Sequence, residues 1–286
     1  FIKASSIHLG IDSNSVTIVE GKAFTDEDGN MYSGALTGKQ LSAIEGKKLE
    51  PCYMVTLDLQ KDGAPIMLPA TFDENGVAFV KKPDNPTRGG FTFVGWFTDK
   101  EGGSEFDFTK AVTENTVVYA KWMENTPVEY VDENGETKSV SDYVLLTNDI
   151  YVDNLPGGWY VVEGEVKYTS QVNFEGNAHL ILVNGAKMEI ETAGESEYGI
   201  LASNNLTIYG QSKQSGILNV TAKGPNSQGI VSNGNITIIG GRVTATGSSD
   251  GIYTDAGDIT LGWTNSTDFI KASSIHLGID SNSVTI

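Results

Sequence analysis

The sequence is poor in the residue types on which disulfide, metal and nucleophilic chemistry usually depends. It contains one cysteine, Cys52, and three histidines, His8, His179 and His276. A single cysteine excludes an intrachain disulfide, and with no evident partner Cys52 is expected to be a buried, inert thiol. The histidines form no cluster with cysteine at zinc-ligand spacing, so neither a zinc site nor a Ser-His-Asp triad is predicted.

Positive charge and long apolar runs are also scarce. The chain has 19 Lys and Arg against 37 Asp and Glu, which gives a formal net charge of −18. A chain this acidic repels phosphate backbones, so nucleic-acid binding is not expected. No apolar run approaches the roughly 20 residues that a membrane helix needs, so no membrane insertion is expected in this segment.

The most informative feature present is a long internal identity. Residues 1–18 and residues 269–286 both read FIKASSIHLGIDSNSVTI, at an offset of 268 residues (269 minus 1). An engineered duplication or a circular permutation would produce such an identity. We favour a window cut from a longer chain with a 268-residue period, because both copies interrupt a strand-like pattern.

A shorter repeat lies inside this period. Its four members are GILASNNLTI (199–208), GIVSNGNITI (229–238), GIYTDAGDITL (251–261) and GIDSNSVTI (278–286). Each begins with Gly-Ile, continues through small polar residues suited to positive-φ corners, and ends on an apolar-Thr-apolar triplet. The triplet alternates with period two, which is typical of a half-buried strand with threonine on the outer face.

Coils of this length predict a right-handed parallel β-helix, in which isoleucines stack inside from rung to rung. A β-sandwich is the alternative, but it would not repeat the Gly-Ile and Ile-Thr-Ile phrases in phase. Earlier coils are expected at YVLLTNDIYVDN (143–154) and HLILVNGAKMEIETAG (179–194). Residues 1–50 contain a predicted hairpin with its turn near Asp28-Gly29 and a short helix closed by Gly46, and we interpret them as the last coils and cap of a preceding β-helix.

The middle of the chain has a different pattern. FTFVGWF (91–97) is an aromatic strand, and FDFTKAVTENTVVYAKW (106–122) predicts a strand, a short helical turn capped by Thr109 and a final strand. The motifs GWFTDKEGG, FDFTKAVTENT and YAKW resemble, in order and spacing, the internalin B-repeat, also called the Listeria–Bacteroides repeat. The resemblance implies a small β-grasp-like domain with one short helix, with Trp96 and Trp122 in its core, in a bacterial surface protein.

A second resemblance concerns the coils. HLILVNGAKMEI, NLTIYGQS, GILNVTA and GNITIIGGRVTATG are similar to the repetitive β-helix surface proteins of gut bacteria. The expected fold is therefore mainly β: a right-handed parallel β-helix plus a small β-grasp-like domain, in tandem modules. The expected domains are residues 1–50 (end and cap of the preceding β-helix), 51–123 (B-repeat) and 124–286 (β-helix, in which 269–286 repeats 1–18).

Support for catalysis is weak. Lyases with this fold need an arginine or lysine base, and the only arginines are Arg88, within the B-repeat motif, and Arg242, which we expect to face solvent. Glycosidases need two facing carboxylates. Asp255, Asp258 and Asp280 recur near coil corners, where Asp and Asn more often bond their own backbone. No enzymatic activity and no resident cofactor are predicted.

Two weaker candidates concern binding. Asp26, Asp28 and Asn30 alternate in TDEDGN loosely as in a Ca²⁺ loop, but the full EF-hand pattern is missing. The aromatic side chains that we expect near coil edges could stack on sugars or pack beneath a cap. They are Trp159, Tyr160, Tyr253 and Trp263.

These observations lead to one main hypothesis and two competitors. We expect a structural repeat module of a long extracellular bacterial surface protein, stalk or filament, whose partners are neighbouring modules of the same kind. The alternative is an adhesin module that binds host or dietary glycans through a β-helix face. A polysaccharide lyase or hydrolase is the least favoured hypothesis.

Overall fold

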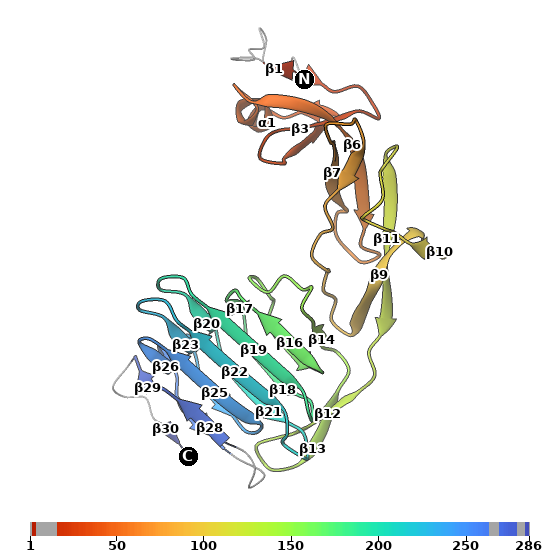
Figure 1. Cartoon of the computed structure of the whole chain (residues 1–286). Helices are drawn as coiled ribbons and strands as arrows, with labels where there is room; N and C mark the ends of the chain where they lie inside the picture. The colour runs from red at the N-terminus through yellow and green to blue at the C-terminus, as the bar shows by residue number, and fades with distance from the viewer. Residues whose placement is uncertain (1, 4–15, 263–268, 279–283, 286) are drawn as a thin grey trace. The chain divides into compact units, whose positions relative to one another are not determined.

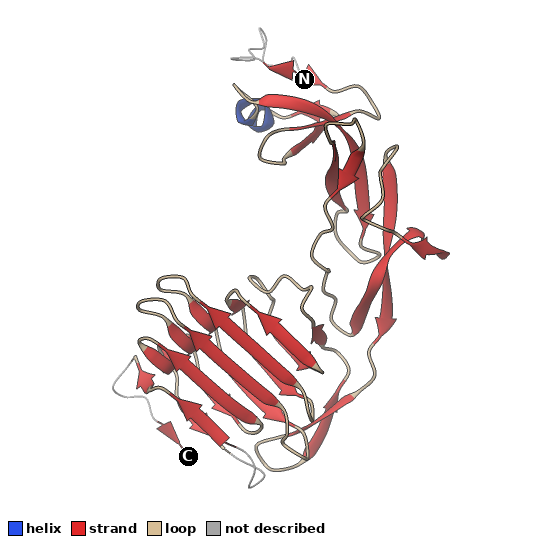
Figure 2. Cartoon of the chain, viewed as in Figure 1, coloured by secondary structure: helices blue, strands red, loops and turns tan. Residues whose placement is uncertain are grey.

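The computed structural model describes residues 2–3, 16–262, 269–278 and 284–285. Over these ranges the regular secondary structure is almost entirely β-strand, which confirms the expected mainly β class (Figures 1 and 2). It divides into two compact units: unit 1 is Phe1–Pro83 with Phe93–Trp122, and unit 2 is Asp84–Thr92 with Met123–Ile286. His8, Trp263 and Asp280 lie outside the described residues.

Unit 1 is organised around a mixed sheet with the strand order β10-β9-β11-β6-β3-β4, in which β1 and β7 also pair with β6 and β8 pairs with β7. The strands are β1 Ile2–Lys3, β3 Ala23–Thr25, β4 Met31–Ser33, β6 Lys48–Asp58, β7 Ile66–Phe72, β8 Ala78–Val80, β9 Phe91–Asp99, β10 Gly102–Glu105 and β11 Thr116–Glu124. A small second sheet pairs β2 Val16–Thr17 with β5 Ala35–Leu36, and the helix α1 spans Gly38–Ala43.

The long strand β6 holds unit 1 together. Its first half pairs with β3, and its second half pairs with β7 on one side and runs parallel to β11 on the other. The expected boundary between residues 50 and 51 falls inside this uninterrupted strand. Val55, Leu57, Trp96 and Val118 form the centre of the core beside it, and Cys52 is buried on the same strand. Burial raises the pKa of the Cys52 thiol to about 11, consistent with an inert thiol.

The predicted helix in the first 50 residues is confirmed. Thr37 caps α1: its hydroxyl accepts the Gln40 N–H, while the Gln40 side chain accepts the Thr37 N–H, which satisfies two donors at the helix start. Gly46 follows with φ of 76°, a left-handed conformation that favours glycine. The hairpin is confirmed as well, since β3 and β4 are antiparallel and Gly29 lies in their turn.

The helical turn expected at Thr109 is wrong. Residues 107–110 form a hydrogen-bonded turn instead, in which the Asp107 carboxylate accepts the Thr109 N–H at 3.0 Å and the Thr109 hydroxyl at 2.6 Å. The Lys110 N–H donates to the Asp107 carbonyl, which closes the turn. An aspartate that satisfies local backbone donors in this way favours a turn over a helix.

Unit 2 contains three parallel sheets and a hairpin. The hairpin pairs β12 Val128–Val131 with β13 Thr137–Val140. The first sheet is β14 Val144–Leu146, β15 Gly158–Val162, β18 Ala178–Leu182, β21 Leu206–Gly210, β24 Ile236–Ile238, β27 Ile259–Leu261 and β30 Val284–Thr285. The second sheet is β16 Glu165–Tyr168, β19 Lys187–Thr192, β22 Ile217–Ala222, β25 Arg242–Gly247 and β28 Phe269–Ala272. The third sheet is β17 Val172–Phe174, β20 Tyr198–Ala202, β23 Gln228–Ser232, β26 Asp250–Thr254 and β29 Ile275–Leu277.

The chain visits these sheets in rotation. From β15 onward, three consecutive strands belong to the first, second and third sheets, and the fourth returns to the first sheet beside the strand it started from (Figure 1). This arrangement is consistent with a solenoid of stacked coils, as the short repeat predicts. The apolar-Thr-apolar triplets lie in register, with Leu206, Ile236 and Ile259 all buried and their threonine neighbours outside.

The glycines of the Gly-Ile phrases have a different role from the expected positive-φ corner. None of Gly199, Gly229 and Gly251 has a positive φ. A Cβ on Gly199 would lie 2.1 Å from Val220 Cγ1, and one on Gly229 would lie 2.6 Å from the Gly251 carbonyl oxygen. Glycine is therefore required by the close approach of neighbouring coils.

The fourth member of the short repeat is out of phase. The register partner of Ile252 is Ile275, so Ser274-Ile275 takes the place that Gly-Ile has in the other three coils. Gly278 lies after strand β29, and its N–H donates to the Thr254 carbonyl. Gly278 therefore follows a third-sheet strand instead of preceding one, although Val284 and Thr285 do occupy the expected first-sheet positions.

An asparagine ladder supports one corner of the stack. The side-chain oxygens of Asn177, Asn205 and Asn235 accept the backbone N–H of residues 205, 235 and 258 at 3.2, 2.8 and 2.9 Å. Each asparagine side chain thus bonds the backbone of the next coil rather than its own, and in this way supports the coil corner. Asp258 takes part in this ladder through its backbone N–H, which donates to the Asn235 side chain.

Truncating one core isoleucine should measure the strength of the stack. Ile230→Ala removes a fully buried side chain that lies between Ile200 and Ile252 in register, so we expect it to lower the free energy of unfolding by about 2–5 kcal/mol. Thr260→Ala, on an exposed outer position, should change it by less than about 0.5 kcal/mol. Urea denaturation followed by circular dichroism makes the comparison, and equal effects would contradict the stacked core.

Candidate functional site

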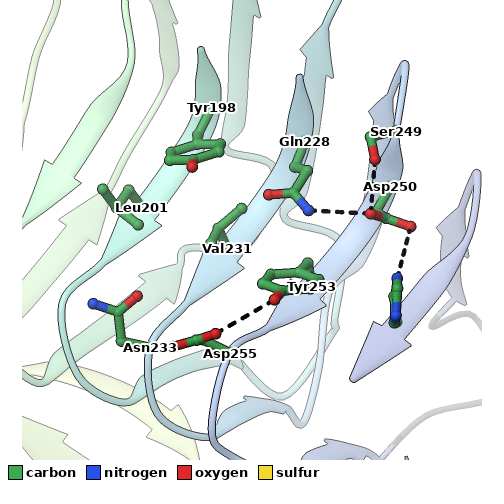
Figure 3. Close-up of a pocket in the computed structure, with 10 residues that line it drawn as sticks. Tyr198, Leu201, Gln228, Val231, Asn233, Ser249, Asp250, Tyr253 and Asp255 are labelled. Carbon is green, nitrogen blue, oxygen red and sulfur yellow. Dashed lines mark hydrogen bonds and ion pairs between the residues drawn. The ribbon is translucent and has the colours of Figure 1, made fainter. Parts of the chain in front are cut away.

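A groove runs along the outer face of the third sheet. Its volume is about 540 Å³, within the range of small-molecule sites. It is lined by Tyr198, Leu201, Gln228, Val231, Asn233, Ser249, Asp250, Tyr253, Asp255 and His276 (Figure 3). These residues come from β20, β23, β26 and β29 and from the turns beside these strands, so stacking of successive coils creates the groove.

One row across the groove is polar and tightly bonded. Tyr198, Gln228 and Asp250 are register partners on adjacent strands. The Asp250 carboxylate accepts hydrogen bonds from the Gln228 amide at 3.1 Å and the Ser249 hydroxyl at 3.0 Å (Figure 3). It also accepts one from the Ser274 hydroxyl at 2.9 Å. Burial alone would raise the pKa of Asp250, but these hydrogen bonds outweigh it and hold the pKa below its usual value. Asp250 is therefore a fixed negative charge.

The second row changes from apolar to aromatic along the stack. Leu201, Val231, Tyr253 and His276 follow one another in register. The Tyr253 and His276 rings meet edge to face at 5.5 Å, and the Tyr253 hydroxyl donates to Asp255 at 3.4 Å (Figure 3). Burial, and next the negative charge of Asp255, raise the pKa of Tyr253, so its hydroxyl keeps its proton near neutral pH.

The groove thus combines two kinds of contact. Tyrosine rings offer apolar faces for a ring-shaped ligand, and carboxylates and amides offer acceptors and donors for hydroxyl groups. The imidazole of His276 lies 3.7 Å from Asp250, which lets it pair with that carboxylate when protonated. Two carboxylates, Asp250 and Asp255, give the groove a negative potential that disfavours anionic ligands.

Other aromatic side chains of the stack are covered. The β12–β13 hairpin packs on the outer face of the first sheet, where Tyr130 lies 4.9 Å from Trp159 and 4.8 Å from Tyr209 between ring centroids. Trp159 stacks on His179 at 4.4 Å, and burial lowers the pKa of His179. Tyr160 is in the core, with its hydroxyl bonded to the Pro156 carbonyl. Three of the aromatic residues expected near coil edges lie within the described residues: Trp159, Tyr160 and Tyr253. Among these three, Tyr253 alone lines the groove.

The candidate Ca²⁺ loop is organised by a lysine. Both carboxylate oxygens of Asp26 accept hydrogen bonds, from the Asp28 and Asn30 backbone, the Asn30 amide, the Tyr32 hydroxyl and the Lys47 ammonium at 3.1 Å. Lys47 also bonds Asp28 at 2.6 Å. An ammonium therefore occupies the place a cation would take. Burial would raise the pKa of Asp26, but the hydrogen bonds, from Asn30 first, hold it well below its usual value. Over the described residues no group of three or more His, Cys, Asp or Glu side chains could hold a metal ion.

The two arginines lie away from the groove. The Arg88 guanidinium stacks over the Phe91 ring at 3.9 Å from its centroid. Arg242 begins β25 in register with Ile217 and Phe269 and is half-buried rather than fully exposed. Neither is placed beside the carboxylates of the third sheet, so the base that a lyase needs is not among the groove residues.

Most groove residues escaped the sequence analysis, although a signal was present. Tyr198, Gln228 and Asp250 each precede the glycine of a Gly-Ile phrase. Aligning the phrases one residue further upstream would have shown three polar or aromatic side chains on one face. Their number and spacing alone could not show that the coils stack in register, which is what brings them together.

Comparison with known proteins identifies one part of the chain. Residues 53–121 match the model of the Listeria-Bacteroides repeat domain. The chain is also similar to Internalin H of Listeria monocytogenes serovar 1/2a (strain ATCC BAA-679 / EGD-e), at 34% identity over 91 residues, or 28% of this chain and 16% of that protein. The chain therefore spans a small fraction of this relative. No solved structure matches the chain. In the described ranges, no helix has the length and apolar character to cross a membrane.

The Asp26 network should make unit 1 sensitive to acid. Asp26→Asn should lower the free energy of unfolding at pH 7 by about 3 kcal/mol, because it removes a buried charge with several partners. Since the folded-state pKa is lowered, the contribution is present above the unfolded-state pKa of about 3.9 and is lost as pH falls toward the folded value.

Urea denaturation at pH 7 and pH 3 tests this account. The difference between the wild-type protein and Asp26→Asn should shrink at pH 3. Asp28→Ala, whose side chain is 64% exposed, is the matched control and should cost less than about 1 kcal/mol. A difference that stays constant with pH would contradict a lowered pKa at Asp26.

Proposed function

We propose that this chain is a structural repeat module of a long extracellular bacterial surface protein. The observation that carries the proposal is the identity of residues 1–18 with residues 269–286, whose second copy supplies the strands β28, β29 and β30. The Listeria-Bacteroides repeat domain and the similarity to Internalin H support a surface location. We further propose that the three parallel sheets form a right-handed β-helix, since parallel crossovers are almost always right-handed.

A structural role fits the energetics of the stack. Each coil buries its apolar side chains only against its neighbours, so length can increase by whole periods without a new fold. Unit 1 supplies a compact spacer between successive solenoids. We therefore expect the partners of the module to be neighbouring modules of the same chain, and no catalytic step is assigned to it.

Adding periods tests the proposal directly. A chain in which residue 286 is followed by further copies of residues 19–286 should gain one constant increment in length for each added period. Negative-stain electron microscopy and small-angle X-ray scattering measure the long dimension. Compact particles whose length does not grow with the number of periods would contradict a stalk.

Antibodies against the chain should label intact cells of the source bacterium, and labelling only after lysis would contradict a surface location.

A second function is favoured by the groove on the third sheet. We propose that it binds neutral glycans, with the Tyr253 ring against a sugar face and Asp250, Asp255 and Gln228 bonded to hydroxyl groups. The two carboxylates disfavour sugars that carry carboxylate or sulfate groups. Hydrolysis would need an acid with a raised pKa, whereas the pKa of Asp250 is lowered, so binding is better supported than catalysis.

Substitution in the groove should abolish glycan binding. A screen of neutral glycans identifies a ligand, and Tyr253→Ala should then weaken its affinity at least tenfold, because the stacking face is lost. Tyr151→Ala removes an exposed tyrosine of unit 2 outside the groove and should leave affinity unchanged. Calorimetry on both variants makes the comparison. The proposal fails if no neutral glycan binds, or if both variants lose affinity equally.

A further inference from the structure

The two copies of the repeated segment pair with different strands. In the second copy, Val284–Thr285 runs parallel to β27 at the end of the first sheet. In the first copy, the identical Val16–Thr17 runs antiparallel to β5 of unit 1. The same exchange occurs earlier in the segment, because Ile270 and Lys271 pair with β25 whereas Ile2 and Lys3 pair with β6.

The two pairings of the last strand use opposite edges. Successive residues of a strand direct their N–H and C=O groups to alternate sides. In the solenoid, the Ile236 N–H donates forward to the Asp258 carbonyl, and the Gly262 N–H donates back to the Ile238 carbonyl. Through the register of β24, β27 and β30, Val284 therefore directs its N–H forward, away from β27, and Thr285 directs its N–H back toward β27.

The first copy shows the complementary arrangement. The Ile18 N–H donates to the Gly34 carbonyl at 2.8 Å, so residues 16 and 18 direct their backbone groups toward β5 and Thr17 directs its groups away. Val16 corresponds to Val284, whose groups point to the open edge of the solenoid. The edge that β5 occupies in unit 1 is thus the edge that β27 leaves open in unit 2, and one strand can pair with both.

The apolar faces match as well. In unit 1, Val16 and Ile18 pack with Leu36, Ile44 and Leu49 in one cluster. In unit 2, Val284 is the register partner of Ile259, which is fully buried in the solenoid core. The side chain that faces the cluster in the first copy is therefore the one that faces the end of the solenoid core in the second.

The apolar cluster of unit 1 and the end of the solenoid core in unit 2 are both partly exposed to solvent. Unit 1 has a hollow of about 360 Å³ beside the strand, lined almost wholly by apolar side chains. Its lining is Val16, Thr17, Ile18, Val19, Lys22, Phe24, Leu36, Ile44 and Leu49. At the end of the solenoid, Phe269, Ile275 and Val284 are 48%, 41% and 42% exposed. An open solenoid end of this kind is an edge that natural proteins cover.

We propose that residues 19–50 of one period close the solenoid of the period before it, and that the segment FIKASSIHLGIDSNSVTI is the strand set shared by both. The inference rests on the proposed function as a tandem array and names the partner surface. β5 extends the first sheet past the shared strand, β6 extends the second sheet, and α1 with its apolar cluster covers the end of the core. The occupant of the hollow is thus the solenoid end of a preceding copy of this sequence.

An extended chain tests the shared strand. The 286-residue protein is continued after residue 286 by a copy of residues 19–50, and amide hydrogen exchange is followed by NMR in both proteins. In the extended protein, exchange at Val284 should slow at least tenfold because its N–H gains β5 as partner, while Thr285 keeps its protection from β27. No change at Val284, or slowing at Val284 with faster exchange at Thr285, would overturn the proposal.

A control variant and a cross-link make the result specific. Leu36→Asp in the appended copy places a charge in the apolar cluster and should abolish the slowing at Val284. Thr17 and Ala35 face each other as a non-hydrogen-bonded pair, whose Cα atoms lie about 4.5 Å apart, within disulfide range. Thr17→Cys with Ala35→Cys in the original chain is therefore the positive control.

The corresponding pair across the junction is Thr285→Cys with Ala35→Cys in the appended copy. This pair should form a disulfide, while amide exchange at residue 285, whose N–H is directed toward β27, stays slow. A junction pair that fails to cross-link while the positive control does would overturn the shared strand. Constant growth in length with added periods, together with an unprotected Val284, would reject this junction but leave the array itself supported.

Discussion

In-register stacking of buried side chains is the constraint on which unit 2 depends. Ile200, Ile230, Ile252 and Ile275 lie one above another in the third sheet, and the first three are fully buried. A single coil has apolar side chains on its inside and nothing of its own to cover them, so its stability comes from the coils on either side. Close stacking in turn demands glycine before the isoleucine, where a Cβ would meet the backbone of the next coil. The asparagine corner ladder keeps the coils in register by bonding each one to the next.

The same stacking decides which outer face is open to ligands. The first sheet carries Trp159 and Tyr209 on its outer face, and the β12–β13 hairpin covers them, with the Gln211 amide donating to the Glu129 carbonyl across the contact. The third sheet places Tyr198 and Tyr253 among carboxylates and amides, and these side chains line a groove. Two sheets that both carry outer aromatic side chains therefore differ in what they expose, because the hairpin that precedes the stack in the chain covers only those of the first sheet.

Unit 1 joins two parts that differ in sequence pattern. The Listeria-Bacteroides repeat domain and the preceding residues share the strand β6, so the sheet passes from one to the other without a linker. A shared strand transmits its position rigidly, whereas a flexible linker would not. This continuity gives the strands that precede residue 51 a defined place relative to the repeat domain that follows them in the chain.

The sequence by itself determined the class of the fold, the coil repeat, the helix α1 and the Listeria-Bacteroides repeat, because each depends on local periodicity or on motifs close together along the chain. Apolar-Thr-apolar alternation requires a half-buried strand wherever it occurs, and Thr37 with Gln40 can cap a helix without any distant partner. Tertiary structure decided the rest. The uninterrupted β6, the role of Lys47 beside Asp26 and the assembly of the groove all depend on residues distant in sequence. In unit 2, register between coils brings the groove residues together, and register is a property of the packed stack rather than of any one segment.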